Sequence, residues 1–126
     1  MALNTNQTTD TVTPSTGTAT TSGNVVVSAG DLSVSTAGKG LQIKEGSNAK
    51  MGVATLNGAG TVTVSTTAVT ANSRIFLSYA NKGTASGVSE PLWVSSINAG
   101  MSFVIKSGVS GSSNDANVNW LIIEPA

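Results

Sequence analysis

This 126-residue chain contains no cysteine and no histidine, two residue types on which enzymes and disulfide-linked folds rely. Without cysteine there can be neither a disulfide framework nor a zinc site built on thiolates. Histidine is the commonest general base and cysteine the most reactive nucleophile, so a catalytic triad in its usual form is excluded. The fold must therefore be stabilised by packing and assembly.

Charge is also scarce, because Asp, Glu, Lys and Arg make up 10% of the sequence and cancel to a formal net charge of zero. No basic stripe exists that could neutralise phosphates, so we expect no nucleic-acid partner. A net charge near zero does little to keep copies apart, which suits a protein that works in an oligomer or on a larger particle. The sequence has no signal-peptide core and no apolar run of about eighteen residues, so we expect no membrane partner.

Residues 1–23 are dominated by threonine, and their only sizeable apolar side chains are Met1, Leu3 and Val12. Such a segment cannot build a core, so it either stays disordered or lies extended on a partner. The β-branch of threonine favours an extended backbone, which makes strand addition to a neighbour the expected bound form. We predict an extended anchoring arm over residues 1–23, with Leu3 and Val12 as its apolar anchors on a partner protein.

Residues 24–46 form a small repeat in which glycines recur at steps of seven, eight and eight, at Gly23, Gly30, Gly38 and Gly46. Glycine beside a polar residue is a turn signal, because glycine adopts positive φ without cost. The intervening runs of about five residues alternate apolar and polar side chains, which is typical of strands. Such short strands make either a tight meander or the rungs of a shaft wound from three chains.

The third predicted domain, residues 47–126, contains six runs with a period of two, which indicates strands, and no helical period. The expected strands span residues 51–56, 60–65, 74–79, 91–97, 101–107 and 118–124. Three sets of side chains should each share one face: Val62 with Val64; Met101, Phe103 and Ile105; and Val118, Trp120 and Ile122. Residues 120–123 are apolar on both faces, so this strand should lie between two layers or against a neighbouring subunit. We predict an all-β fold, an antiparallel β-sandwich or jelly-roll-like domain.

Five segments, in order along the chain, resemble a β-module of bacteriophage tail fibres, tailspikes and capsid appendages. They are GKGLQIKEGSNAKMGVATL (38–56), GTVTV (60–64), VTANSRIFL (69–77), AGMSFVI (99–105) and VNWLIIEPA (118–126). The resemblance covers residues 38–126, about two thirds of the sequence. It implies a virion structural or attachment protein, and it brings no catalytic residues and no cofactor with it.

The six carboxylates offer little sign of an enzyme that cleaves polysaccharide, which needs two of them facing each other across a cleft. They are Asp10, Asp31, Glu45, Glu90, Asp115 and Glu124. Asp31 is typical of a turn, and Glu124 belongs to the closing segment of the resemblance. Residues 114–117 offer several oxygens but lack the rest of a calcium loop, so a β-turn is favoured over a metal site. We expect a protein that is not an enzyme.

Two function hypotheses stay open. The first is a capsid decoration or head-fibre protein, located on the virion, that forms a homotrimer and binds the major capsid protein or another virion protein through its arm. Trimer contacts should then include residues 23–46.

The alternative is a tail fibre or receptor-binding tip whose loops, residues 80–90 and 107–117, recognise a bacterial surface glycan. Trp93 and Tyr79 are the aromatic side chains placed to stack on a sugar, although core or interface packing competes for both. The candidate glycan-binding residues are Tyr79, Lys82, Trp93, Asn114 and Asp115.

Overall fold

The computed structural model describes residues 21–83, 90–108 and 115–126. The chain divides into two units, Met1–Gly40 and Leu41–Ala126, and each is described by itself. The predicted anchors Leu3 and Val12 lie outside the described residues, so the anchoring arm stays a prediction. No helix among the described residues is long and apolar enough to cross a membrane.

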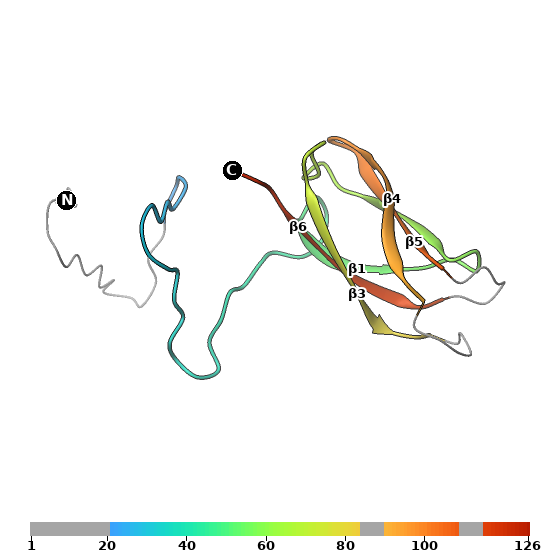
Figure 1. Ribbon diagram of the computed structural model, residues 1–126, viewed down its shortest axis with the longest axis horizontal. Coiled ribbons are helices and arrows are strands. Elements are labelled where there is room, and N and C mark those ends of the chain that lie inside the picture. The colour runs from blue at the N-terminus through green and yellow to red at the C-terminus, as the bar shows by residue number, and fades with distance from the viewer. Residues whose placement is uncertain (1–20, 84–89, 109–114) are drawn as a thin grey trace, which may run out of the picture. The chain divides into compact units, whose positions relative to one another are not determined.

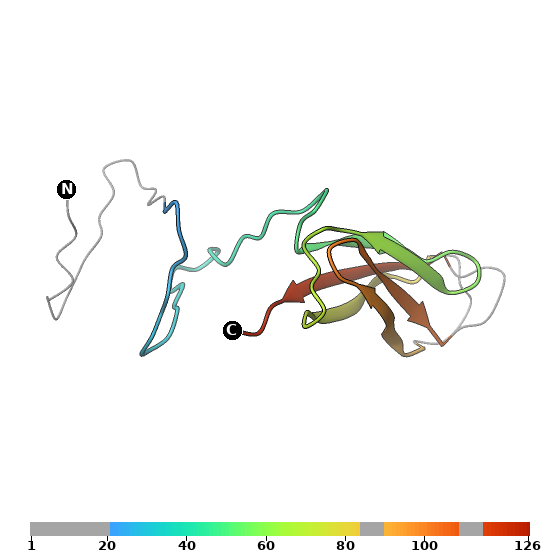
Figure 2. The same ribbon diagram turned by 90° about the horizontal axis from the view of Figure 1, so that it is seen from above.

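The second unit is a sandwich of two antiparallel three-stranded sheets (Figures 1 and 2). One sheet has the order β1-β6-β3 and the other the order β2-β5-β4. The strands are β1 (Met51–Thr55), β2 (Thr61–Ser65), β3 (Arg74–Asn81), β4 (Leu92–Asn98), β5 (Ser102–Ser107) and β6 (Asn117–Ile123). The chain therefore changes sheets at every connection except the β4–β5 hairpin. This confirms the predicted all-β fold, and the part of the chain that the structure describes contains no helix.

The core lies between the two central strands, β5 and β6. Phe103, Ile105 and Val118 are completely buried, and the rings of Phe103 and Trp120 meet edge to face with centroids 5.5 Å apart. These side chains alternate with exposed ones along each strand, because successive residues of a strand point to opposite faces. The predicted faces of β2 and β6 are confirmed, since Val64 and all three residues of the β6 set are buried.

Met101 departs from the predicted face that it was to share with Phe103 and Ile105. Its side chain is 63% exposed, and its backbone N–H donates to the carbonyl of Asn98 in the β4–β5 turn. Gly100 adopts φ +72° there, a conformation that glycine allows without strain. The turn takes Met101 out of the strand, so the prediction for this residue was wrong, and Ser107 extends the buried face at the other end.

Residues 21–40, the described part of the first unit, are exposed throughout. Val25 and Val26 are 71% and 80% exposed. No strand forms between residues 21 and 44, a stretch that the structure describes in full, and Glu45 makes one isolated bridge to Met51. The short strands expected here are thus not formed within a single chain. Rungs shared among several chains stay a prediction, as do the predicted domain bounds.

Candidate functional site

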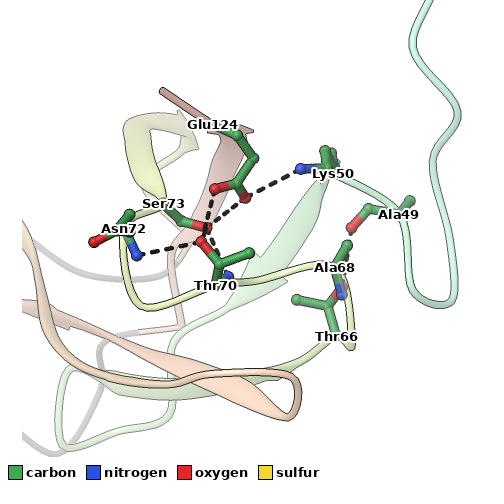
Figure 3. Close-up of polar contacts among 8 residues, drawn as sticks. All are labelled: Ala49, Lys50, Thr66, Ala68, Thr70, Asn72, Ser73 and Glu124. Atoms are coloured by element: carbon green, nitrogen blue, oxygen red, sulfur yellow. Dashed lines mark hydrogen bonds and ion pairs between the residues drawn. The ribbon is translucent and has the colours of Figure 1, made fainter. Parts of the chain in front are cut away.

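A cluster of polar side chains joins Glu124, the first residue after β6, to Lys50, just before β1, and to the β2–β3 loop (Figure 3). One carboxylate oxygen of Glu124 accepts from Lys50 Nζ at 3.0 Å and from Ser73 Oγ at 2.6 Å. The other accepts from Thr70 Oγ1 at 2.8 Å. Thr70 also donates its backbone N–H to Ser73 Oγ at 2.8 Å, which fixes the loop. Two segments that carry the sequence resemblance, 69–77 and 118–126, therefore meet at one carboxylate.

The electrostatics of this cluster favour the ionised form of Glu124. Hydrogen bonds from Ser73 and Thr70 and the charge of Lys50 lower the pKa of the Glu124 carboxyl from 4.5 to about 2. Charge-assisted hydrogen bonds of this kind stabilise a carboxylate, and an acid group held ionised in this way is not a proton donor near neutral pH. The cluster therefore forms a structural clamp between the end of β6, the start of β1 and the β2–β3 loop.

The clamp predicts a specific dependence of stability on pH. Because the folded pKa is below the unfolded one, the stabilisation from Glu124 is complete above pH 4.5 and is lost as the pH falls towards 2. We expect Glu124→Gln to lower the melting temperature at pH 7 and to flatten its fall between those two pH values. Thermal unfolding followed by circular dichroism measures both effects. Glu45→Gln is the control, because it changes an exposed carboxylate outside the clamp; its melting temperature should fall with pH as that of the wild type does. An unchanged slope of melting temperature against pH in Glu124→Gln would contradict the clamp.

Two of the predicted glycan-binding residues, Lys82 and Asp115, lie at the opposite end of the sandwich, where Gly83, the residue after Lys82, approaches Asp115. Gly83, at φ +57°, approaches Asp115 so closely that a Cβ on it would lie 2.1 Å from the Asp115 carboxylate oxygen. Both Lys82 and Asp115 are exposed. Asn114 lies outside the described residues, as do residues 84–89 and 109–113 of the two predicted loops. Only part of the predicted loop surface can therefore be placed.

The two aromatic candidates have different environments. Tyr79 pairs with Val118 across the β3–β6 ladder and packs against the core, which favours a structural role. Trp93 is 43% exposed and lines a groove of about 480 Å³ between the edge strands β3 and β4. Phe76 and Arg74 line the same groove from β3. Trp93 therefore remains a candidate for stacking on a ligand, whereas the packing of Tyr79 against the core gives no support for that role.

Phe76 and Arg74 were missed as candidates by the sequence analysis. The signal was present in the alternation of β3, because Ile75 and Leu77 point into the core and leave Phe76 outside, 60% exposed. Phe76 and Trp93 border one groove because the edge strands β3 and β4, from different sheets, lie next to each other. No local sequence pattern predicts which edge strands become neighbours.

No group of three or more acidic, histidine or cysteine side chains that could hold a metal ion occurs among the described residues. Asn117 of the weighed calcium segment belongs to β6, and its amide oxygen accepts from Thr55 Oγ1 at 2.7 Å. Ala116 in the same segment is buried. Ala116 and Asn117 of this segment are thus engaged in the sheet and its edge.

Residues 48–123 match a known family that is described as the K1 capsule-specific polysaccharide lyase, C-terminal domain. No curated protein and no solved structure matches the chain. The matched residues begin just before β1 and end with β6, so they contain the whole sandwich. At a coarse level this agrees with the resemblance to a fibre or tailspike module. The chain therefore belongs to the family of the C-terminal domain of the K1 capsule-specific polysaccharide lyase.

Proposed function

We propose that this protein is a non-catalytic structural module of a bacteriophage fibre or tailspike and that it works as an assembly of its own copies. The observation that carries the proposal is an apolar patch on the outer face of the β1-β6-β3 sheet, the face turned away from the core. The outer patch consists of Met51, Val53, Phe76, Leu121 and Ile123. Val53, Phe76 and Ile123 are 56%, 60% and 49% exposed.

The outer patch is continuous across the three strands. Leu121 of β6 stands in register between Met51 of β1 and Phe76 of β3. Ile123 pairs with Arg74, which brings a cation to the edge of the patch. A contiguous apolar area on the surface of a monomer typically marks an interaction site. The apolar second face of residues 120–123, noted in the sequence, thus faces outward in a single chain and fits a neighbouring subunit.

The rest of this outer face is polar, so the patch has a boundary. Thr55 donates to Asn117, and Asn119 donates to Ser78 Oγ at 3.4 Å, nearer the end with Lys82 and Asp115. The apolar half is at the end where β1 begins and β6 ends. A subunit contact confined to that half leaves the loop end free, as a projecting module requires.

The number of copies that we propose is three, in keeping with the resemblance to fibres. The exposed valines of residues 25–27 supply further apolar surface that a single chain leaves uncovered. A partner virion protein would bind the arm, and the module would be part of the virion.

For the position on the virion, the family name favours a tail fibre or tailspike, and a capsid decoration or head fibre is the competing location. Gold-labelled antibody against this protein, viewed on intact virions by electron microscopy, separates the two. We expect label at the tail. Label on the head would support the decoration hypothesis, and virions without label would contradict both locations.

A second candidate function, binding of a bacterial surface glycan, is favoured by the groove between β3 and β4. Trp93 and Phe76 expose aromatic surface there, and Arg74 adds a positive charge that would suit an acidic polysaccharide. We expect binding on an array of capsular polysaccharides that Trp93→Ala removes and Tyr79→Phe retains. Equal binding by both variants would place any glycan contact elsewhere.

A further inference from the structure

A second pocket opens on the opposite side of the sandwich, between the edge strands β1 and β2. Its volume is about 520 Å³, which is within the usual range for small-molecule sites. Gly52 and Val53 of β1 and Val64 of β2 form its walls, together with residues 45–47 before β1. The indole of Trp120 lies at the pocket's inner side.

The indole of Trp120, one of the side chains that line this pocket, carries an unused hydrogen-bond donor. The side chain is 6% exposed, and its Nε1–H is buried with no acceptor among the residues that the structure describes. Buried polar groups nearly always have a partner, so an exception needs an explanation. An acceptor supplied by a bound molecule would satisfy this N–H in a setting of low dielectric, where a hydrogen bond is strong.

Gly52 is what lets the indole reach the pocket. It stands opposite Trp120 in the β1–β6 ladder, and a Cβ on it would lie 2.7 Å from Cζ2 and 3.3 Å from Nε1 of the indole. No side chain other than hydrogen therefore fits without moving the ring. The indole fills the space that a side chain of β1 would occupy, which brings Nε1 to the edge strand rather than to the middle of the core.

The remaining polar groups of the pocket come from both of its walls. Glu45 brings a carboxylate, which accepts hydrogen bonds, and Ser47 and Ser65 bring hydroxyls, which donate and accept. Two hydrogen bonds between side chains and the backbone hold the segment before β1 in place. Thr66 Oγ1 donates to the carbonyl of Ala49, and Asn48 Oδ1 accepts from the N–H of Thr67, both at 3.0 Å. The position of Ala49 beside Thr66 can be followed in Figure 3.

We propose that this β1–β2 pocket binds a neutral sugar unit. A pyranose has hydroxyls that can accept from Trp120 Nε1–H and donate to Glu45, and it has an apolar C–H face that suits Val53 and Val64. The carboxylate of Glu45 disfavours an acidic sugar, because like charges repel. The pocket thus differs in charge from the β3–β4 groove, where Arg74 favours an anion. Val53 also belongs to the outer patch, so the pocket borders the proposed subunit contact, whereas it shares no lining residue with the β3–β4 groove.

The two tryptophans of the chain make a direct test possible. In the full-length protein labelled with ¹⁵N on the indole, NMR should give two Nε1–H signals, and Trp93→Phe identifies the one from Trp120. D-galactose, D-glucose and L-fucose are titrated as neutral probes, D-glucuronate as the acidic probe and glycerol as a hydroxyl control. An oligosaccharide of galactose is compared with the monosaccharide, which distinguishes a polysaccharide end from a free sugar as the ligand.

We expect at least one neutral sugar to move the Trp120 signal, with a dissociation constant on the order of millimolar. Glu45→Gln should weaken that binding about tenfold, and glucuronate should bind about tenfold more weakly than the neutral sugar, each equivalent to about 1.4 kcal/mol. Glu90→Gln is the matched control and should bind as the wild type does, while the dispersion of the spectra shows that both variants fold. A tighter oligosaccharide would indicate a polysaccharide end as the ligand.

Four results would overturn the proposal. The first is a Trp120 signal that no neutral sugar moves. The second is movement of the Trp93 signal alone, which would assign sugar binding to the β3–β4 groove. The third is an equal response to glycerol and to the sugars, and the fourth is an unchanged affinity in Glu45→Gln. Either of these two would show contact without a site for a sugar ring.

Discussion

Trp120→Ala should destabilise the sandwich more than any other single truncation of an aromatic residue in it. The side chain is buried, stacks edge to face on Phe103 and covers Gly52, so its loss leaves a cavity that no neighbour can fill. Truncation of a buried tryptophan to alanine typically costs about 3 to 5 kcal/mol. A domain of this size is usually stable by roughly 5 to 15 kcal/mol, so the variant should be near the limit of folding.

Urea unfolding followed by far-ultraviolet circular dichroism measures the effect without relying on tryptophan fluorescence. Trp93→Ala is the matched control, because this side chain is 43% exposed and its loss should cost about 1 kcal/mol or less. All proteins are compared at one concentration, since assembly would add to apparent stability. Equal urea midpoints of unfolding for Trp120→Ala and the wild type would contradict the burial of Trp120 in the core.

Light scattering of the full-length protein at micromolar concentration should give the mass of about three chains, and Phe76→Lys should reduce it to one. Phe76 lies in the outer patch and is 60% exposed within one chain, so its replacement leaves the sandwich itself intact. A lysine in a subunit contact, however, would bury an unpaired charge, which costs several kcal/mol. A threefold change in mass is therefore expected from one surface substitution.

Thr63→Lys provides the control for this change, because Thr63 is exposed on β2, in the other sheet. It should keep the mass of the wild type. A second variant, in which the three valines at residues 25–27 become asparagine, tests whether the first unit contributes to the contact. A wild-type protein that is a folded monomer, stable on dilution, would contradict the assembly and with it the proposed function.

The strands and the buried faces follow from the sequence because they depend on alternation, which is a local property. Each of the six predicted runs became a strand, and Val118, Trp120 and Ile122 are buried as their period indicated. Met101 was misplaced because the turn at Gly100, also local, removes it from the strand. The lack of cysteine and histidine likewise excluded whole classes of site without reference to any structure.

What the tertiary structure alone decided is which side chains from distant strands stand together. The groove with Phe76 and Trp93 and the clamp around Glu124 each join elements far apart in the sequence, and the pairing of strands, not their period, brings them into contact. The unpaired N–H of Trp120 could not be predicted from the sequence for the same reason, because its burial depends on Gly52, which stands opposite it in the β1–β6 ladder. A sequence determines what each residue can do, whereas hydrogen bonding and burial depend on neighbours that only the folded sheets supply.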